Sequence, residues 1–149
     1  MRRFFRGGLC LLALSSAACA PKAGSELTVL ATEGVRDPSG AIELEMAYQN
    51  LGEASVLFAF KMRALGTEEM DKLVLDLKLD GLHLLEGNTE WSGFVPPRQP
   101  QTHRVSLVTA EGAERANVTV SVRRSVDSEL LMQREFTFRV TPSGLEPVS

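Results

Sequence analysis

The sequence predicts an all-β protein that folds as a single antiparallel β-sandwich of about seven to eight strands. Three observations support this fold class: apolar and polar residues alternate through several short segments, turn residues separate these segments, and apolar positions with helical spacing are scarce. The chain has 149 residues, which suits one domain rather than two. Hydrophobic residues make up 44% of it and charged residues 23%, a balance that allows a buried core.

The first residues have the pattern of a secretion signal. Three arginines among the first six residues precede an uncharged, largely apolar run from 7 to 18. This run is too short to span a bilayer, which needs about 20 apolar residues. We therefore expect residues 1–18 to be a signal peptide that is removed from the mature chain.

The end of this signal carries further information. Residues 16–19 read Ser-Ala-Ala-Cys, which resembles the lipobox of bacterial lipoproteins, with Ser16 in place of the family's usual Leu, Val or Ile. The resemblance implies that Cys19 becomes the first mature residue and carries lipid, and that Ala20 directs the protein to the outer membrane. The alternative is cleavage by ordinary signal peptidase after residue 20, which would place Pro21 directly after the cut.

Cleavage before Cys19 defines the expected parts of the mature chain. Residues 19–25 are small and polar and form a short tether, residues 26–142 form the sandwich domain, and residues 143–149 form a C-terminal tail. The other cysteine leaves with the signal, so no disulfide is expected. The lipid would anchor the protein to a membrane of the bacterial cell envelope, with the domain facing the periplasm or the exterior.

Strand signals follow in order along the domain. The apolar positions that share one strand face are Leu27 and Val29; Ile42, Leu44, Met46 and Tyr48; Val56, Phe58, Phe60 and Met62; Leu73, Leu75, Leu77 and Leu79; Val105 and Leu107; Val118, Val120 and Val122; and Phe136, Phe138 and Val140. Leucine favours helix, but the apolar positions within 73–79 fall on both sides of a helix and on one side of a strand. We expect strands with one face in a core and the other in water.

Turn residues lie between these strands, at 37–40, 50–52, 66–67, 87–88, 96–97 and 111–112. Strands 41–48 and 56–63 are expected to form a hairpin around residues 50–54. The predicted register pairs Leu44 with Phe60, Glu43 with Lys61 and Ile42 with Met62. Opposite charges across a ladder contribute about 0.2–1 kcal/mol, which favours this register.

Three segments in the second half carry a resemblance to a known group of domains. Residues 84–93 end in a Trp-x-Gly step at 91–93, residues 97–108 lead through a strand into a turn, and residues 116–122 form an alternating valine strand. Together they resemble the extracellular immunoglobulin-like modules of bacteria, which occur in surface repeats, adhesion proteins and envelope accessory proteins. The resemblance implies an immunoglobulin-like sandwich and carries no active site.

One loop is a candidate interaction edge. Trp91, Phe94, Pro97 and Arg98 lie in or beside the proline-rich segment 96–100. Proline-rich loops with aromatic residues recur at interaction sites. The alternative is that Trp91 caps the sandwich core while the prolines end a strand.

Catalytic and metal sites are not expected. The two histidines, His83 and His103, lie in different segments, whereas a zinc site needs three or four ligands. The motifs Gly-x-Ser-x-Gly, Ser-x-x-Lys, His-Glu-x-x-His and the P-loop are absent from the sequence. We therefore expect no catalytic residue, no metal and no cofactor.

The predicted function is that of a non-enzymatic envelope lipoprotein, a binding or assembly module at the membrane surface. Its expected partners are the membrane, through the lipid anchor, and a protein of the envelope. A net charge of -3 argues against a general nucleic-acid binder, whose domain should be clearly basic. The alternative is a periplasmic enzyme or metal-binding protein with a site built from scattered histidines and carboxylates.

Overall fold

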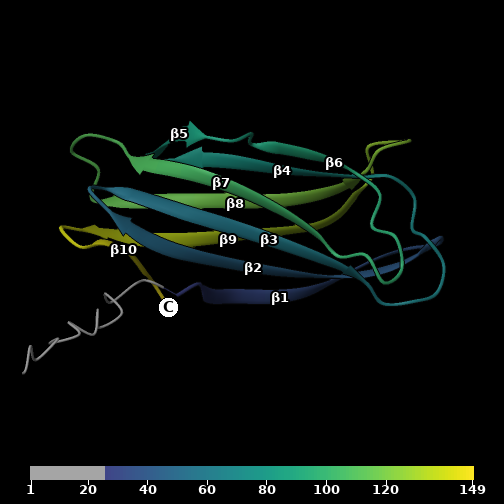
Figure 1. Ribbon diagram of the computed structural model, residues 1–149. Helices are drawn as coiled ribbons and strands as arrows, with labels where there is room; N and C mark the ends of the chain where they lie inside the picture. Colours follow the sequence, from purple (N-terminus) through teal and green to yellow (C-terminus); the bar gives the residue numbers. More distant parts are fainter. Residues whose placement is uncertain (1–25) are drawn as a thin grey trace, which may run out of the picture.

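Two five-stranded antiparallel sheets pack face to face in the computed structural model, which describes residues 26–149 (Figure 1). Sheet A contains, in spatial order, β1 (Thr28–Asp37), β2 (Gly40–Gly52), β3 (Ser55–Ala64), β7 (Gln101–Thr109) and β5 (Leu82–Glu86). Sheet B contains β10 (Gly144–Pro147), β9 (Leu130–Thr141), β8 (Arg115–Arg124), β4 (Leu73–Asp80) and β6 (Glu90–Gly93). The predicted all-β sandwich is confirmed.

Residues 26–149 contain ten strands, against the seven to eight predicted. The additional ones are short: β5 has five residues, and β6 and β10 have four each. Strands of this length contain too few alternating positions to be recognised from the sequence. No helix among the described residues is long and apolar enough to cross a membrane.

The expected C-terminal tail is partly a strand, which corrects the predicted extent of the sandwich. β10 lies within residues 143–149 and pairs with the end of β9. Leu145 is buried in the core. The side chain of Asn50 holds it in place, because Asn50 Nδ2 donates to the Leu145 carbonyl (3.0 Å) and Asn50 Oδ1 accepts from the Leu145 N–H (2.9 Å). This contact ties β10 to sheet A.

The predicted β2–β3 hairpin forms, but its register is wrong by two residues. The observed partners are Met62 for Leu44, Arg63 for Glu43 and Ala64 for Ile42, in place of the predicted Phe60, Lys61 and Met62. Arg63 Nη2 donates to Glu43 Oε1 at 3.0 Å on the outer face. A shift of two residues keeps every side chain on its predicted face, so alternation alone could not exclude it.

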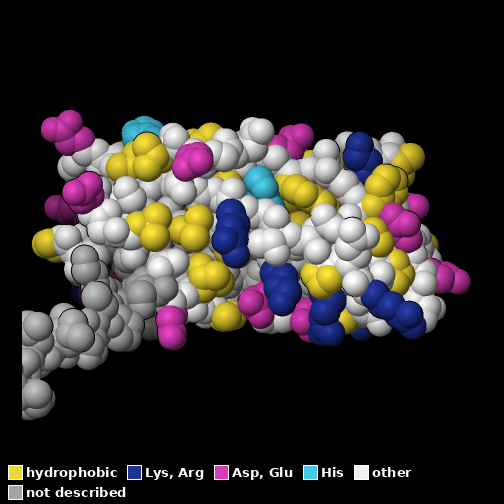
Figure 2. Space-filling model, in the orientation of Figure 1, with side chains coloured by type: hydrophobic (Ala, Val, Ile, Leu, Met, Phe, Trp, Pro, Cys, Tyr) yellow, Lys and Arg dark blue, Asp and Glu magenta, His cyan; other side chains and the backbone are white. Residues whose placement is uncertain are grey.

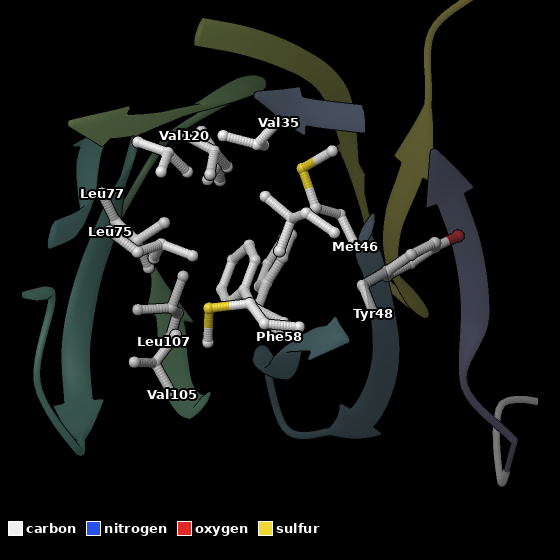
Figure 3. Close-up of a cluster of buried hydrophobic side chains, with 14 of the residues drawn as sticks. Val35, Met46, Tyr48, Phe58, Leu75, Leu77, Val105, Leu107 and Val120 are labelled. Atoms are coloured by element: carbon white, nitrogen blue, oxygen red, sulfur yellow. The ribbon is translucent and has the colours of Figure 1, made fainter. Parts of the chain in front are cut away.

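The core lies between the sheets and consists of apolar side chains together with Tyr48. Figure 3 shows side chains from both sheets, such as Leu75 and Leu107, pointing into the same interior. Phe58 and Phe138 meet across the sheets with ring centroids 5.7 Å apart, edge to face. The Tyr48 hydroxyl points out of the cluster (Figure 3), and burial together with the charge of Glu146 raises the pKa of Tyr48.

The strands run between two ends of the sandwich (Figure 1). The N-terminal end contains the start of β1, Gly81 and the turns 53–54, 110–114 and 142–143. The loop end contains the four connections 38–39, 65–72, 94–100 and 125–129. β1 starts at the first end and finishes at the second, so the chain enters the domain opposite the loop end.

Candidate functional site

Three of the four connections at the loop end are joined to one another by hydrogen bonds. The backbone N–H of Leu65 donates to the Ala41 carbonyl at 3.0 Å, and that of Ser125 donates to the Lys72 carbonyl at 2.8 Å. The N–H of Asp71 donates to Ser39 Oγ at 2.9 Å. These bonds join the β1–β2, β3–β4 and β8–β9 connections. A partner would therefore meet three loops that already hold one another in place.

The residues predicted as an interaction edge take different positions at this end. Trp91 on β6 is half-buried and packs against the core. Its ring also covers Gly93, because a Cβ added to Gly93 would lie 3.0 Å from Trp91 Cζ2. Phe94, directly after β6, is 50% exposed. Pro97 is half-buried, and Arg98 is exposed with a φ of 62°. Phe94 and Arg98 are thus the members of the predicted edge that face solvent.

Other loops at this end also expose apolar side chains. Leu65 is 45% exposed, Val126 79% and Leu130 43%. Figure 2 shows hydrophobic side chains, in yellow, among charged ones at the end of the molecule where these loops lie. Sequence reasoning does not single out Leu65 or Val126, because an isolated apolar residue between turn residues has no periodicity. Leu65, Phe94 and Val126 thus place apolar groups on three different loops.

An arginine organises the β8–β9 turn. Arg124 donates from Nη2 to Asp127 Oδ2 at 2.6 Å and from Nε to Asp127 Oδ1 at 3.1 Å, and it also bonds Glu129. The Arg124 side chain is only 14% exposed. The hydrogen bond to Asp127 raises the pKa of Arg124, and the same bond lowers the pKa of Asp127 to about 2. This turn is therefore held by charge-assisted hydrogen bonds.

Asp37 connects this arginine to the β1–β2 turn. Asp37 Oδ1 accepts hydrogen bonds from the backbone N–H groups of Ser39 (2.7 Å) and Gly40 (3.0 Å), an arrangement that stabilises tight turns. Asp37 Oδ2 is buried and has no hydrogen-bond donor within the described chain, but Arg124 Nη1 lies 3.9 Å away. The positive charge of Arg124 thus faces carboxylates from two loops.

Acidification is expected to weaken the Arg124 network over a defined range. The pKa of Asp127 falls from its ordinary value of 3.8 to about 2 in the folded protein. Such a carboxylate stabilises the fold fully above its ordinary pKa, and this stabilisation is lost as the pH falls from 3.8 towards 2. In Asp127→Asn, the thermal unfolding midpoint, followed by circular dichroism, should therefore depend less on pH across this range than in the parent.

Asp76→Asn is the control for this experiment, because it removes a carboxylate from the outer face of β4 instead. Its unfolding midpoint should follow that of the parent as the pH falls. A pH dependence that is the same in Asp127→Asn and in the parent would show that the Arg124 network does not stabilise the fold.

The two histidines do not come together. His83 is exposed on β5 and pairs with Val108 of β7, five residues along that strand from His103. The His103 ring stacks on Phe60 at 6.4 Å, and its Nε2 lies 2.7 Å from the Asn88 carbonyl oxygen. Within residues 26–149, no group of three or more histidine, cysteine, aspartate and glutamate side chains is placed to hold a metal ion.

The predicted signal peptide and the lipid site at Cys19 lie outside the described residues. No protein family and no curated protein matches the sequence. Among solved structures, the chain is similar to the cupredoxin domain of amoB from Nitrosocaldus yellowstonii, with 7% sequence identity and a TM-score of 0.35. The match covers 56% of this chain and 54% of that chain, about half of each. Similarity at this level carries no argument about chemistry.

Proposed function

We propose that this protein is a non-enzymatic envelope lipoprotein that binds a protein partner through the loop end of its sandwich. The observation that carries the proposal is the exposure of Leu65, Phe94 and Val126 on three loops at one end of the molecule. Exposed apolar residues also occur at the N-terminal end, at Leu27, Val29 and Leu51, so the proposal rests on Phe94 lying close in the sequence to an exposed arginine as well as on exposure. Hydrogen bonds among the loops that carry Leu65 and Val126 hold them in place, which reduces the entropy lost on binding.

The charges of the loop end indicate what kind of protein would bind. The connection 94–100 has one charged residue, Arg98, which is exposed close to Phe94 in the sequence. A partner that covers this connection would place apolar side chains on Phe94 and an acidic side chain near Arg98. Aromatic residues and arginine are enriched at the centres of protein interfaces, which fits this pairing.

The direction of the chain supports display from a membrane. A lipid on Cys19 would be joined to the first strand by residues 19–27, and nine residues span at most about 32 Å. Thr28, where β1 begins, lies at the N-terminal end, and β1 reaches the loop end only at Asp37. The lipid and the loop end therefore belong to opposite ends of the domain. A binding surface at the loop end would then lie away from the lipid.

A cross-linking experiment in the native envelope tests both parts of the proposal. The full chain with a C-terminal tag is expressed, its cells are fractionated, and tagged complexes are recovered from the membrane fraction after cross-linking. The parent should be in the membrane fraction, with a lipid-modified Cys19 by mass spectrometry and a cross-linked protein partner. Cys19→Ser should move the protein out of the membrane fraction, and Phe94→Ser should lose the partner but keep the membrane location.

Leu51→Ser is the matched control, because Leu51 is 51% exposed at the N-terminal end of the sandwich. It should recover the same partner as the parent. An unmodified N-terminus at Pro21 would contradict the lipid anchor. Recovery of the same partner with Phe94→Ser as with Leu51→Ser would contradict the loop end as the binding surface.

A further inference from the structure

One edge of sheet B is only partly covered. β9 has twelve residues, and β10 pairs with the last four of them, from Phe138 to Thr141. The N–H of Val148 extends this cover by one bond, to the Thr137 carbonyl at 2.9 Å. On this side of β9, no strand of the described chain pairs with residues 130–136. Natural sandwiches usually protect such edges, because an unpaired strand invites another strand to pair with it.

The hydrogen-bond pattern shows which backbone groups are open. The N–H of Val140 donates to the Glu114 carbonyl at 2.9 Å, so Val140 directs its backbone groups towards β8. Along an antiparallel strand, the backbone N–H and C=O groups of successive residues point alternately to the two neighbouring strands. Thr137 correspondingly directs its carbonyl to the side of β10, where it accepts from Val148. Gln133 and Glu135 therefore direct their backbone N–H and C=O groups to the open side. Both residues are exposed.

The open stretch of β9, residues 130–136, can pair with the same stretch of a second copy. It begins at Leu130 and ends at Phe136, so its midpoint is Gln133, whose backbone groups point outward. An antiparallel strand centred on Gln133 is related to β9 by a two-fold axis, which is the symmetry of most dimers. We propose that two copies of this chain pair β9 with β9 about Gln133, which joins their B sheets into one continuous sheet.

The side chains favour this register over its neighbours. About Gln133, Arg134 of one copy lies opposite Met132 of the other, and Glu135 lies opposite Leu131, so no like charges meet. Pairing about Arg134 would place two guanidinium groups opposite each other, and pairing about Glu135 would do the same with two carboxylates. Like charges directly opposite each other destabilise a ladder. Pairing about Glu135 would also compete for the Thr137 carbonyl, which Val148 already uses.

A groove of mixed character lies next to the open edge, beside the proposed pairing. It has a volume of about 270 Å³, and its lining combines apolar side chains, among them Leu30 and Phe136, with the charged side chains of Arg134 and Glu135. It lies between β1 of sheet A and β9 of sheet B, which are also joined by the ion pair of Glu33 and Arg134 at 2.5 Å. In the proposed dimer, Leu130 of the second copy lies opposite Phe136 and brings an apolar side chain to the groove.

Sedimentation equilibrium of the purified chain 26–149, which contains every strand of both sheets, tests the dimer. The parent should show a monomer–dimer equilibrium at concentrations up to about 1 mM. Gln133→Pro removes an N–H donor that β8 does not use, and proline is tolerated on a free strand edge. It should weaken dimerisation at least about tenfold while the thermal unfolding midpoint stays near that of the parent.

Two further variants distinguish the proposed pairing from other contacts. Gln133→Ala keeps the backbone donor and should dimerise as the parent does. Gln133→Glu places two carboxylates on the two-fold axis and should weaken dimerisation at low salt more than at high salt. A parent that is monomeric at every concentration would overturn the proposal. So would a dimer that Gln133→Pro and Gln133→Glu leave unchanged.

Discussion

Replacing Phe138 with alanine is expected to lower the free energy of unfolding by about 3–5 kcal/mol. Phe138 is completely buried in sheet B, and its ring meets those of Tyr48 (5.5 Å) and Phe58 (5.7 Å) from sheet A. The substitution would remove both aromatic contacts and leave a cavity that backbone strands on either side cannot easily close. A domain of this size has about 5–15 kcal/mol of stability in total, so the loss would be a large part of it.

Urea unfolding followed by circular dichroism measures this effect. Phe94→Ala is the matched control, because it makes the same chemical change at a side chain that is 50% exposed. Its effect should stay within about 0.5 kcal/mol of the parent. Equal losses in Phe138→Ala and Phe94→Ala would show that the aromatic contacts between the sheets do not hold the sandwich together.

The second large effect is expected at Gly81, where the chain crosses from β4 in sheet B to β5 in sheet A. Gly81 has a φ of +73°, and a Cβ at this position would lie 2.4 Å from the Arg115 carbonyl oxygen. That oxygen belongs to the backbone at the start of β8, so it cannot turn away as a side chain could. Gly81→Ala combines backbone strain with overpacking and should cost about 2–5 kcal/mol.

Gly112→Ala separates these two causes. Gly112 has nearly the same φ, +75°, but a Cβ there would have no atom within 4 Å. Its cost should be that of the backbone conformation alone, about 1–2 kcal/mol. Urea unfolding of both variants measures the difference, which reports the contact with Arg115. If both variants lost the same stability, close packing of Gly81 against β8 would play no part.

The sequence predicts which face of each strand is buried better than it predicts which residues pair. Ile42, Leu44 and Met46 are all buried, as their alternation indicates. The β2–β3 register was nevertheless two residues off, because such a shift leaves every face unchanged. The turn that sets the register contains Glu53 and Ala54, both with positive φ. Neither belongs to the glycine and asparagine signals by which such turns are recognised.

The candidate site shows the same limit. The segment with Phe94 and Arg98 was predicted because aromatic, proline and arginine residues follow one another in the sequence. The contact of Arg124 with Asp37 has no such signal, because it depends on which strand ends are neighbours in the folded sandwich. The predicted C-terminal tail likewise includes Leu145, because nothing in the local sequence shows that Asn50, in the first half of the chain, binds its backbone.

Sheet B can be completed only late in synthesis, because its central strand, β8, lies in the last third of the chain. β4 is made earlier, but its main partner is β8, and Leu73 pairs with Arg124. The β1–β2–β3 meander of sheet A, by contrast, needs only neighbouring segments. Pairings between distant segments slow folding, and sandwiches typically fold in milliseconds to seconds. During synthesis, the growing chain would therefore expose the apolar face of its first three strands until residues 115–124 emerge and the opposite layer can form.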